Sequence, residues 1–395
     1  MNKVKLGQAV DILDYKRIPV SSAERANREK VYPYYGAQGV VDYIDDYIFD
    51  GEYVLVAEDG NNLKTLSEPI VTWATGRFWV NNHAHIIGGN GTADIRYVYY
   101  YLMASDLRGL ITGSAQPKLN QENLASFELE LPGREAQVKI AEVLRSIDDK
   151  IALNKKIMTE LEDTARLIYD YWFTQFDFPD ENGKPYRSSG GKMVYDETLN
   201  REIPEGWEVT KIGKQCELRL GGTPDTSVRE FWGGGMPWLN SAEVAVSPIL
   251  RAEKNITKAG VENSATSFAP AGSVLLSITR YIRPSILAID ACFNQSVVAI
   301  LENRTLHTEF LYPFVQSQVP RYLTLRTGAQ QPHINKVTVS ETCFSMPTEL
   351  ILARYYDKVA PIFNQLILVA KAVDRLSALR DWLLPMLVNG QVHVD

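Results

Sequence analysis

The strongest pattern of apolar and polar positions along the chain is a heptad repeat that occurs twice. In residues 134–176 apolar residues recur at alternating intervals of four and three, and the same spacing returns in residues 348–395. This spacing places apolar side chains on one stripe of a helix and is typical of a coiled coil. It predicts two helices of roughly 40 residues, or about 60 Å each at 1.5 Å per residue, that pack on each other.

One polar residue interrupts each stripe, and two prolines lie in the second segment. The stripes include Ile140, Leu144, Ile147, Ile151, Asn154 and Leu161 in the first segment, and Ile362, Leu366, Val369, Val373, Leu376 and Arg380 in the second. Asn154 and Arg380 would restrict the register or the choice of partner at a cost in stability. Pro361 is expected to kink the second helix or delay its start, and Pro385 to fray its end.

Each heptad segment follows a region that reads mainly as short strands. GEYVLVAEDG (51–60) and AGSVLLSITR (271–280) are both rich in Val and Leu and correspond to each other within residues 1–133 and 207–347. Residues 177–206 are rich in Pro, Gly and Ser, which indicates a linker with room for a small hairpin. The expected fold class is α+β, with two mixed α/β regions and two long coiled-coil helices.

A nine-residue phrase appears twice and indicates an internal repeat. TGSAQPKLN at residues 112–120 returns as TGAQQPHIN at residues 327–335, and the offset of 215 also aligns the two heptad stripes. The glycines permit a tight turn, and the prolines stiffen the exit. We assign a role at the junction of region and helix, or in docking a partner, to Gly113, Gln116, Pro117, Asn120, Gly328, Gln331, Pro332 and Asn335.

Composition is that of an ordinary globular protein. The 395 residues are 45% hydrophobic, no apolar run is long enough to cross a bilayer, and the N-terminus lacks the apolar stretch of a secretion signal. We therefore expect a cytoplasmic protein with no membrane partner. Cys216, Cys292 and Cys343 are too widely spaced for a disulfide framework or a zinc site, and we expect them to be buried thiols.

The formal net charge of −7 argues against a chain that binds nucleic acid unaided, because phosphate contacts come from Lys and Arg. The charge is unevenly distributed. Residues 211–340 carry 13 Lys and Arg against 9 Asp and Glu, whereas residues 1–133 carry 12 against 17. If DNA is bound, we expect other chains to supply much of the positive charge.

The sequence carries no familiar catalytic motif. It has no glycine-rich dinucleotide loop, no nucleophile elbow, no zinc-protease motif and no Asn-Pro-Pro-Tyr type signature of amino-methyltransferases. His83 and His85 are two apart, so on a strand they would share one face and could begin a metal site, although no third ligand is evident. A polar face that contacts a partner and a structural pair are the alternatives. We expect no catalysis by this chain alone and no bound metal.

Recognition chemistry remains. Asn, Gln, Arg and His side chains on loops suit base edges, since Arg pairs with guanine by two hydrogen bonds and Asn or Gln pairs with adenine. At each single position an ordinary solvated loop is the alternative. The candidate DNA-binding residues are Asn61, Asn62, Lys64, Arg77, Asn82, His83 and His85 in the first half, and Asn240, Ser241, Arg280, Tyr281, Arg283, Asn294 and Gln295 in the second.

Taken together, these phrases resemble the specificity subunit of type I restriction-modification systems. Two copies of T-G-x-x-Q-P-x-[LI]-N each close a globular region and lead to a Pro and a long heptad helix. Other phrases agree, among them VNNHAHII (80–87), SIDDKIALN (146–154), GGKMVYDETLNREIPEGWEV (190–209) and LRDWLLPMLVNGQV (379–392). The resemblance covers essentially the whole chain and matches in order, spacing and duplication.

The resemblance implies a domain plan. Such subunits have two target recognition domains that each read one half of a split DNA sequence, and an antiparallel pair of helices between them acts as a ruler. Residues 1–133 and 207–347 would be the recognition domains, related by pseudo-two-fold symmetry. Residues 134–176 and 348–395 would be the spacer helices, and residues 177–206 the linker.

The resemblance also implies partners and cofactors. Two modification subunits, which hold S-adenosylmethionine and methylate adenine N6, would dock through the repeated regions, and two restriction subunits would add a nuclease that uses ATP and Mg. The chain itself would bind double-stranded DNA, carry no cofactor and catalyse nothing. Internal pseudo-symmetry lets one chain present two equivalent docking faces to identical partners.

Two other functions stay open on the sequence. One is a coiled-coil scaffold whose globular halves bind proteins, which salt-sensitive, sequence-dependent DNA binding would argue against. The other is an enzyme with an unfamiliar site around His83 and His85, which DNA methylation by the isolated chain would favour. The sequence does not decode the bases recognised.

Overall fold

The chain folds into two compact units in the computed structural model. Unit 1 comprises residues 1–151 and 375–395, and unit 2 comprises residues 152–374. The structure describes residues 2–60, 62–65, 69–113, 116–328 and 332–394, without the side chain of Lys64.

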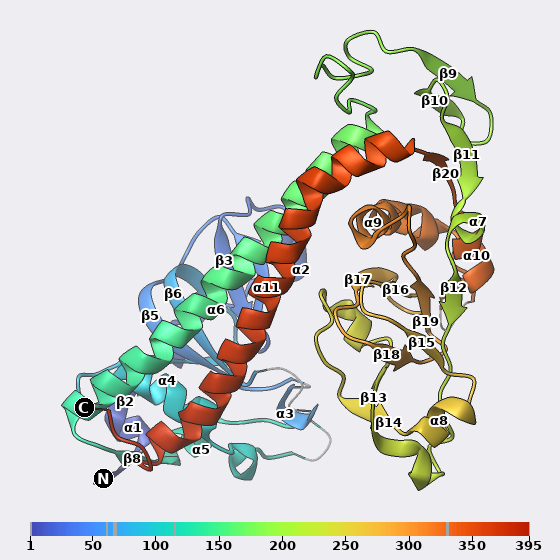
Figure 1. Ribbon diagram of the computed structural model, residues 1–395. Helices are drawn as coiled ribbons and strands as arrows, with labels where there is room; N and C mark the ends of the chain where they lie inside the picture. Colours follow the sequence, from blue (N-terminus) through green and yellow to red (C-terminus); the bar gives the residue numbers. More distant parts are fainter. Residues whose placement is uncertain (1, 61, 66–68, 114–115, 329–331, 395) are drawn as a thin grey trace. The chain divides into compact units, whose positions relative to one another are not determined.

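Unit 1 contains a six-stranded sheet and several short helices (Figure 1). Its elements before the long helices are β1 (Asn2–Lys5), α1 (Leu6–Ala9), β2 (Val10–Ile12), α2 (Ser22–Ala26), β3 (Tyr32–Gly36), β4 (Gly39–Ile44), β5 (Phe49–Ala57), α3 (Asn62–Thr65), β6 (Val71–Val80), β7 (Ala84–Gly89), α4 (Ile95–Ala104), α5 (Gln121–Ser126) and β8 (Glu128–Leu131).

The unit 1 sheet has the strand order β2-β7-β5-β6-β3-β4. Its strand β7 is buried at every residue except the last, because it lies between two partners and is covered on both faces. Helix α4 packs against β5 and β6. It begins where the Asp94 side chain accepts hydrogen bonds from the amides of Arg96 and Tyr97, which satisfies two free N–H groups of the first turn.

Unit 2 contains two four-stranded sheets (Figure 1). Its elements other than the long helices are β9 (Met193–Asp196), β10 (Arg201–Pro204), β11 (Glu208–Lys211), α7 (Ile212–Gln215), β12 (Leu218–Leu220), β13 (Trp232–Leu239), β14 (Lys254–Ile256), α8 (Lys258–Glu262), β15 (Ser267–Ala269), β16 (Val274–Ser277), β17 (Arg283–Ile286), β18 (Ala291–Phe293), β19 (Val297–Ile300), α9 (Thr308–Thr324), α10 (Lys336–Ser340) and β20 (Cys343–Met346).

The two units share one frame of four strands. The order β2-β7-β5-β6 in unit 1 corresponds to β12-β19-β16-β17 in unit 2. In register, Ile87 lies opposite Val54 on β5 just as Ile300 lies opposite Val274 on β16. A two-stranded pair, β1 with β8 or β11 with β20, completes each frame. The internal repeat expected from the sequence is therefore present in the strand order.

Two long helices each contribute residues to both units. Helix α6 (Arg134–Tyr169) continues into a π-helical turn (Asp170–Thr174), and α11 spans Glu349–Val388. Within unit 2, Leu161 and Leu366 line the same small hollow, while the ring centroids of Trp172 and Tyr355 are 5.7 Å apart. The numbering rises along one helix as it falls along the other, so the helices are antiparallel, as expected (Figure 1).

The apolar stripes of the long helices differ in burial along their length. Buried members are Ile140, Leu144, Ile147, Ile151, Leu366 and Val369, and half-buried members are Asn154, Leu161, Ile362, Val373, Leu376 and Arg380. The delayed start expected near Pro361 is wrong, because α11 already begins at Glu349. Burial of Leu352, Tyr355 and Val359 stabilises these early turns although Pro361 lacks a hydrogen-bond donor.

Residues 177–206, expected to be a linker, contain a small hairpin and lie within unit 2. Strands β9 and β10 pair antiparallel, with Met193 opposite Pro204. Before the hairpin, the Phe178 ring stacks on Tyr186 and on Trp207 at centroid distances of 4.7 and 5.3 Å. This aromatic stack packs the segment against Trp207 within unit 2. None of the described helices combines the length and apolar character needed to cross a membrane.

Candidate nucleic-acid interface

The first copy of the repeated phrase forms a closed loop in unit 1. The backbones of Thr112 and Lys118 exchange two hydrogen bonds of 2.9 and 2.8 Å. Gly113 has a φ of +84°, and a Cβ there would lie 2.4 Å from the carbonyl oxygen of Gln116, so the turn requires glycine. The Gln116 side chain is exposed, and Pro117 is half-buried at the exit.

The second copy closes in the same way in unit 2. Thr327 and His333 exchange two backbone hydrogen bonds of 2.9 Å, and Gly328 has a φ of +95°. Pro332 is half-buried, like its counterpart in unit 1, and Gln331 lies outside the described residues. The two phrases are therefore structural equivalents.

The asparagine that ends each phrase caps a short helix. The Asn120 side chain accepts a hydrogen bond of 2.7 Å from the amide of Asn123 at the start of α5. In unit 2, Asn335 accepts one of 2.8 Å from the amide of Thr338 at the start of α10. Capping gives both asparagines a structural reason to be present at the junction that leads to the long helix.

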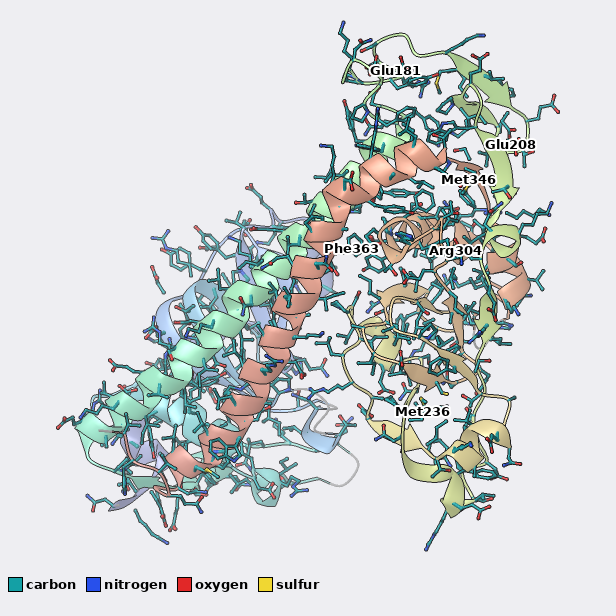
Figure 2. All side chains as sticks on the ribbon, viewed as in Figure 1. Glu181, Glu208, Met236, Arg304, Met346 and Phe363 are labelled. Carbon is teal, nitrogen blue, oxygen red and sulfur yellow. The ribbon has the colours of Figure 1, made fainter. Side chains whose placement is uncertain are left out.

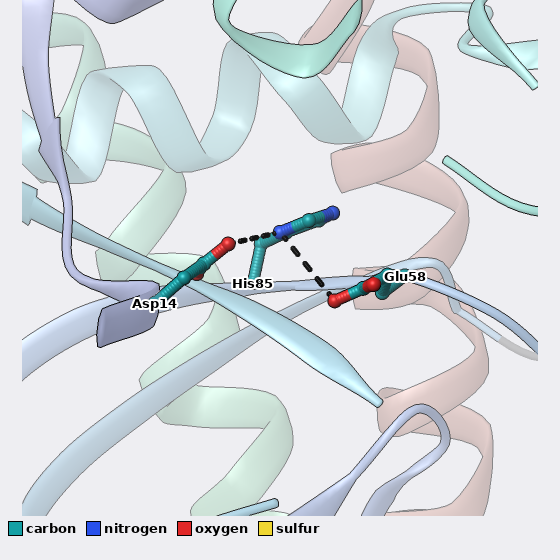
Figure 3. A group of neighbouring side chains, drawn as sticks. All are labelled: Asp14, Glu58 and His85. Carbon is teal, nitrogen blue, oxygen red and sulfur yellow. Dashed lines mark hydrogen bonds and ion pairs between the residues drawn. The ribbon is translucent and has the colours of Figure 1, made fainter. Parts of the chain in front are cut away.

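A buried histidine supports the loop of unit 1. Figure 3 shows this residue, His85, with the neighbouring carboxylates of Asp14 and Glu58. His85 on β7 is 1% exposed, with Nδ1 2.5 Å from Oδ2 of Asp14 and Nε2 2.8 Å from the carbonyl oxygen of Leu119. Because a carbonyl oxygen only accepts, Nε2 carries a proton, and Nδ1 shares another with the carboxyl of Asp14. His85 thus ties the sheet to the loop.

A carboxylate beside the histidine is held by two cations. Glu58 pairs with Arg17 at 2.5 Å and with Lys118 of the loop at 3.0 Å. Burial by itself would raise the pKa of Glu58, but the hydrogen bonds from Arg17 and Lys118 outweigh it and lower the pKa below its ordinary value. Glu58 is therefore a second charged anchor of the loop.

This cluster has the spacing of a metal site but not its chemistry. Potential ligand atoms of Asp14, Glu58 and His85 all lie within 4.8 Å of one another. Both ring nitrogens of His85 already bond to oxygen atoms of the chain. Arg17 and Lys118 balance the carboxylates and would repel a cation. The arrangement fits a structural network.

The expectation that His83 and His85 share one strand face is wrong. Strand β7 begins at Ala84, so His83 precedes it in a turn where its amide donates to the Asn81 side chain at 2.8 Å. The His83 ring is exposed and lies 2.9 Å from the carboxylate of Asp59. Only His83 therefore remains accessible to a partner.

The other candidates of unit 1 are dispersed. Arg77 is exposed, pairs with Asp50 at 3.1 Å and lies 4.8 Å from the centre of the Tyr47 ring. Asn82 is exposed. Asn62 is not an exposed reader, because it is 1% exposed and its side-chain amide donates to the carbonyl of Ala37 at 3.0 Å.

Two further candidates of unit 1 cannot be placed. Asn61 and the side chain of Lys64 lie outside the described residues.

In unit 2 the turn between β16 and β17 brings three candidates together. The guanidinium groups of Arg280 and Arg283 lie 5.2 and 5.4 Å from the ring centre of Tyr281, which is 55% exposed. Arg326 and Leu323 line the same open hollow as these residues. Arg280 has a φ of +56°, a conformation that costs a non-glycine residue about 1–3 kcal/mol. The result is a cationic and aromatic tip in a strained backbone.

The remaining candidates of unit 2 mostly shape turns. Asn240 and Asn294 each accept a backbone hydrogen bond from the amide two residues on, at 2.7 and 3.1 Å. Ser241 is half-buried beside the first turn. Gln295 is exposed, and its Oε1 accepts a hydrogen bond of 2.6 Å from Thr223. Gln295 is the one of these four that offers an exposed side chain.

Sequence reasoning missed Arg326 and the partners of His85. Arg326 directly precedes Thr327, so its place at the edge of the repeated phrase is a signal that could have identified it. Asp14 and Glu58 lie far from His85 in the chain, and no local pattern connects them.

Comparison with known proteins places these features in a family. The family described as "Type I restriction modification DNA specificity domain" matches residues 1–163 and 204–350. A putative type I restriction enzyme specificity subunit of Haemophilus influenzae is 32% identical over 142 residues, which is 36% of this chain and 36% of that protein. The specificity subunit of the type I restriction enzyme MjaIX from Methanocaldococcus jannaschii is 24% identical over 76% of this chain and 69% of its own length.

A solved structure agrees in fold. The S subunit of a type I restriction-modification system from M. genitalium superposes with a TM-score of 0.61 at 14% identity, covering 100% of this chain and 96% of that one. The residues matched by the family include the four-strand frame of each unit and most of the chain. The protein described here therefore belongs to the family of type I restriction-modification DNA specificity proteins.

Proposed function

We propose that this chain is the DNA-recognition subunit of a type I restriction-modification complex and that each unit reads one half of a bipartite, asymmetric target. One observation carries the proposal. The units share a four-strand frame and a closed loop, yet they differ in the side chains at the equivalent tip beside that loop. Unit 1 has Asp59 and Gly60 there, and unit 2 has Thr279 and Arg280. Like frames with unlike tips suit two different half-sites.

Docking of two modification subunits is the second part of the proposal. The exposed faces of the long helices carry apolar residues at positions related by the offset of 215. In unit 2, α6 exposes Leu167 and the π-helical turn that follows it exposes Tyr171, and in unit 1, α11 exposes Trp382 and half exposes Met386. Equivalent apolar residues on two exposed faces suit two identical partners, since aromatic and aliphatic anchors dominate interface energetics.

The chemistry of the complex would reside in the partners. The modification subunits would hold S-adenosylmethionine and methylate adenine N6, and the two restriction subunits would use ATP and Mg. This chain contributes recognition and supplies no catalytic residue.

The long helices would set the distance between the half-sites. At 1.5 Å per residue, the 36 residues of α6 extend about 54 Å, and the 40 residues of α11 extend about 60 Å. Half-sites read from one side of B-DNA lie roughly 34 Å apart per helical turn. A helix of fixed length would therefore fix the number of unspecified base pairs.

Sequencing the methylated adenines of a host that carries this chain and its modification partner tests recognition. The expected target has two unlike half-sites and a fixed gap, and a symmetric target would contradict the proposal. Removing one heptad from both helices, with the stripes kept in phase, should shorten the gap and leave both half-sites unchanged. An unchanged gap would refute the ruler.

Charged substitutions on the helices test docking. Trp382→Asp and Leu167→Asp should each reduce the complex from two modification subunits to one, and the double variant should bind none, measured by native mass spectrometry. Val194→Asp is the matched control, since Val194 is 48% exposed and lies on the hairpin strand β9, outside the long helices. Two bound subunits in the double variant would contradict the assignment of these faces.

A further inference from the structure

Arg280 stands where the equivalent unit uses glycine. In unit 1 the tip after β5 is Gly60, with a φ of +115°, and in unit 2 the tip after β16 is Arg280, with a φ of +56°. A positive φ suits glycine and disfavours an arginine. Glycine would therefore fit this backbone conformation better than arginine. We infer that arginine is present at this position because of its side chain.

The strained tip is held rigidly in place. The amide of Tyr281 donates to the carbonyl of Thr279 at 2.6 Å, which closes a three-residue turn centred on Arg280. The amide of Arg280 donates to the carbonyl of Pro332 at 3.1 Å, so the second copy of the repeated phrase supports the tip. Such anchoring fixes the backbone from which the side chain extends before any partner binds, which reduces the ordering cost of binding.

The arginines at the tip have no acidic partner in the part of the chain that the structure describes, although Nε of Arg326 donates to the carbonyl oxygen of Leu323 at 3.1 Å. Among the described residues, no carboxylate lies within 4 Å of the guanidinium nitrogen atoms of Arg280, Arg283 or Arg326. Tyr281 places an exposed aromatic face between the first two. By contrast, Arg77 of unit 1 is paired with Asp50. Three arginines line one open hollow without a carboxylate partner among the described residues, and two of them lie beside an exposed ring. This arrangement favours an anionic ligand such as a DNA duplex.

We propose that Arg280 reads a guanine in the half-site recognised by unit 2. An arginine donates two hydrogen bonds to O6 and N7 of guanine in the major groove, and no other base offers that pair of acceptors. Tyr281 orients the Arg280 guanidinium through its ring, and Arg283 and Arg326 contact phosphates at the edge of the hollow. This inference rests on the proposed function and deepens it by assigning a base to a residue.

The test uses the complex of this chain with its modification partner and the variant Arg280→Gly. Glycine adopts the positive φ without strain, so the variant keeps the backbone and removes only the side chain. We expect thermal unfolding at the same or a higher temperature. Methylated sites should lose the preference for guanine at one position of one half-site by roughly 10- to 100-fold, with the other half-site unchanged.

Two further variants separate base reading from general attraction. Arg283→Ala should weaken binding to all sequences and reduce the slope of log affinity against log salt by about 1, with the target unchanged. Arg304, which is labelled in Figure 2, is an exposed arginine of unit 2 and does not line the hollow. Arg304→Ala should change neither the target nor the slope.

Failure of this inference differs from failure of the proposed function. If the wild-type complex methylates a bipartite target but Arg280→Gly keeps every base preference, Arg280 is not the reader and the proposed function stands. A target without guanine in the affected half-site overturns the inference equally. If the wild-type complex shows no sequence preference at all, the proposed function itself fails.

Discussion

The two units hold the same loop with different chemistry. Behind the loop of unit 1 lies His85 on β7, opposite Val56. The equivalent position on β19 of unit 2 is Val298, opposite Leu276, and both are fully buried. A charged network supports one loop where an apolar core supports the other.

The packing of the long helices repeats this contrast. In unit 1, Arg380 on α11 pairs with Asp148 on α6 at 3.1 Å, and the Tyr100 hydroxyl donates to the same carboxylate at 2.7 Å. The offset of 215 relates these helix positions to Ala165 and Phe363, which line one small apolar hollow in unit 2. These equivalent positions can therefore be occupied either by a hydrogen-bonded ion pair or by packed apolar side chains. These two sites of unit 1 should therefore respond to pH and salt, and the equivalent sites of unit 2 should not.

The largest effect is expected for His85→Val, which gives unit 1 the residue of unit 2. The change leaves the buried Asp14 carboxyl without its imidazole and should destabilise unit 1 by about 4 kcal/mol. The reciprocal Val298→His buries an unpartnered imidazole and should destabilise unit 2 by about 2–3 kcal/mol. Hydrogen exchange at the amide of Leu119 measures the stability of unit 1, and exchange at the amide of Ile334 measures that of unit 2.

His83→Val is the control for this exchange, since His83 is exposed and should leave both amides unchanged. Unaltered protection of Leu119 in His85→Val would mean that the network does not hold the loop.

A smaller effect is expected where the helices pack. Phe363→Ala leaves a cavity and should destabilise unit 2 by about 3 kcal/mol. Arg380→Ala breaks a pair whose side chains are still 23% and 25% exposed, so the loss in unit 1 should be only about 1–2 kcal/mol. Denaturant unfolding in low and high salt measures the loss of stability in each of the two variants.

Salt separates the two substitutions, because 1 M salt screens charges beyond about 3 Å. The Arg380→Ala effect should shrink in high salt, and the Phe363→Ala effect should not. Equal salt dependence in the two variants would remove the contrast between the units.

Acid should produce the smallest difference. The pKa of Glu58 is lower in the folded protein than its ordinary 4.5, so its stabilising contribution is complete above pH 4.5 and is lost as the pH falls through the lowered value. From pH 5 to pH 3, the amide of Lys118 should lose protection from exchange more than the amide of His333. Glu58→Gln should abolish this difference in pH dependence.

Part of this architecture was accessible from the sequence because it rests on local spacing. The intervals of Leu144 and Ile147, or of Leu366 and Val369, are set by the helical repeat, and burial at these residues follows from it. The repeated phrase is equally local, since Gly113 needs a positive φ wherever its neighbours close the loop.

The rest depends on contacts between distant parts of the chain. His85 meets Asp14 and Leu119 only because β7 lies beside the segment that follows β2. Asn62 was expected to be an exposed polar loop residue, but it is buried and its side chain donates to the carbonyl of Ala37, 25 residues away in the chain. The positive φ of Arg280 is a property of the folded backbone, and the identity of the residue does not predict it.

The division of the chain into units has a consequence for its synthesis. Unit 1 requires residues 375–395, and Leu384, Leu387 and Val388 are part of its core, whereas unit 2 is one uninterrupted stretch. As the polypeptide leaves the ribosome, the half that emerges first must wait for the last segment, and the half that emerges second can close before it. A polypeptide released after residue 374 would contain every residue of unit 2 and lack part of the core of unit 1.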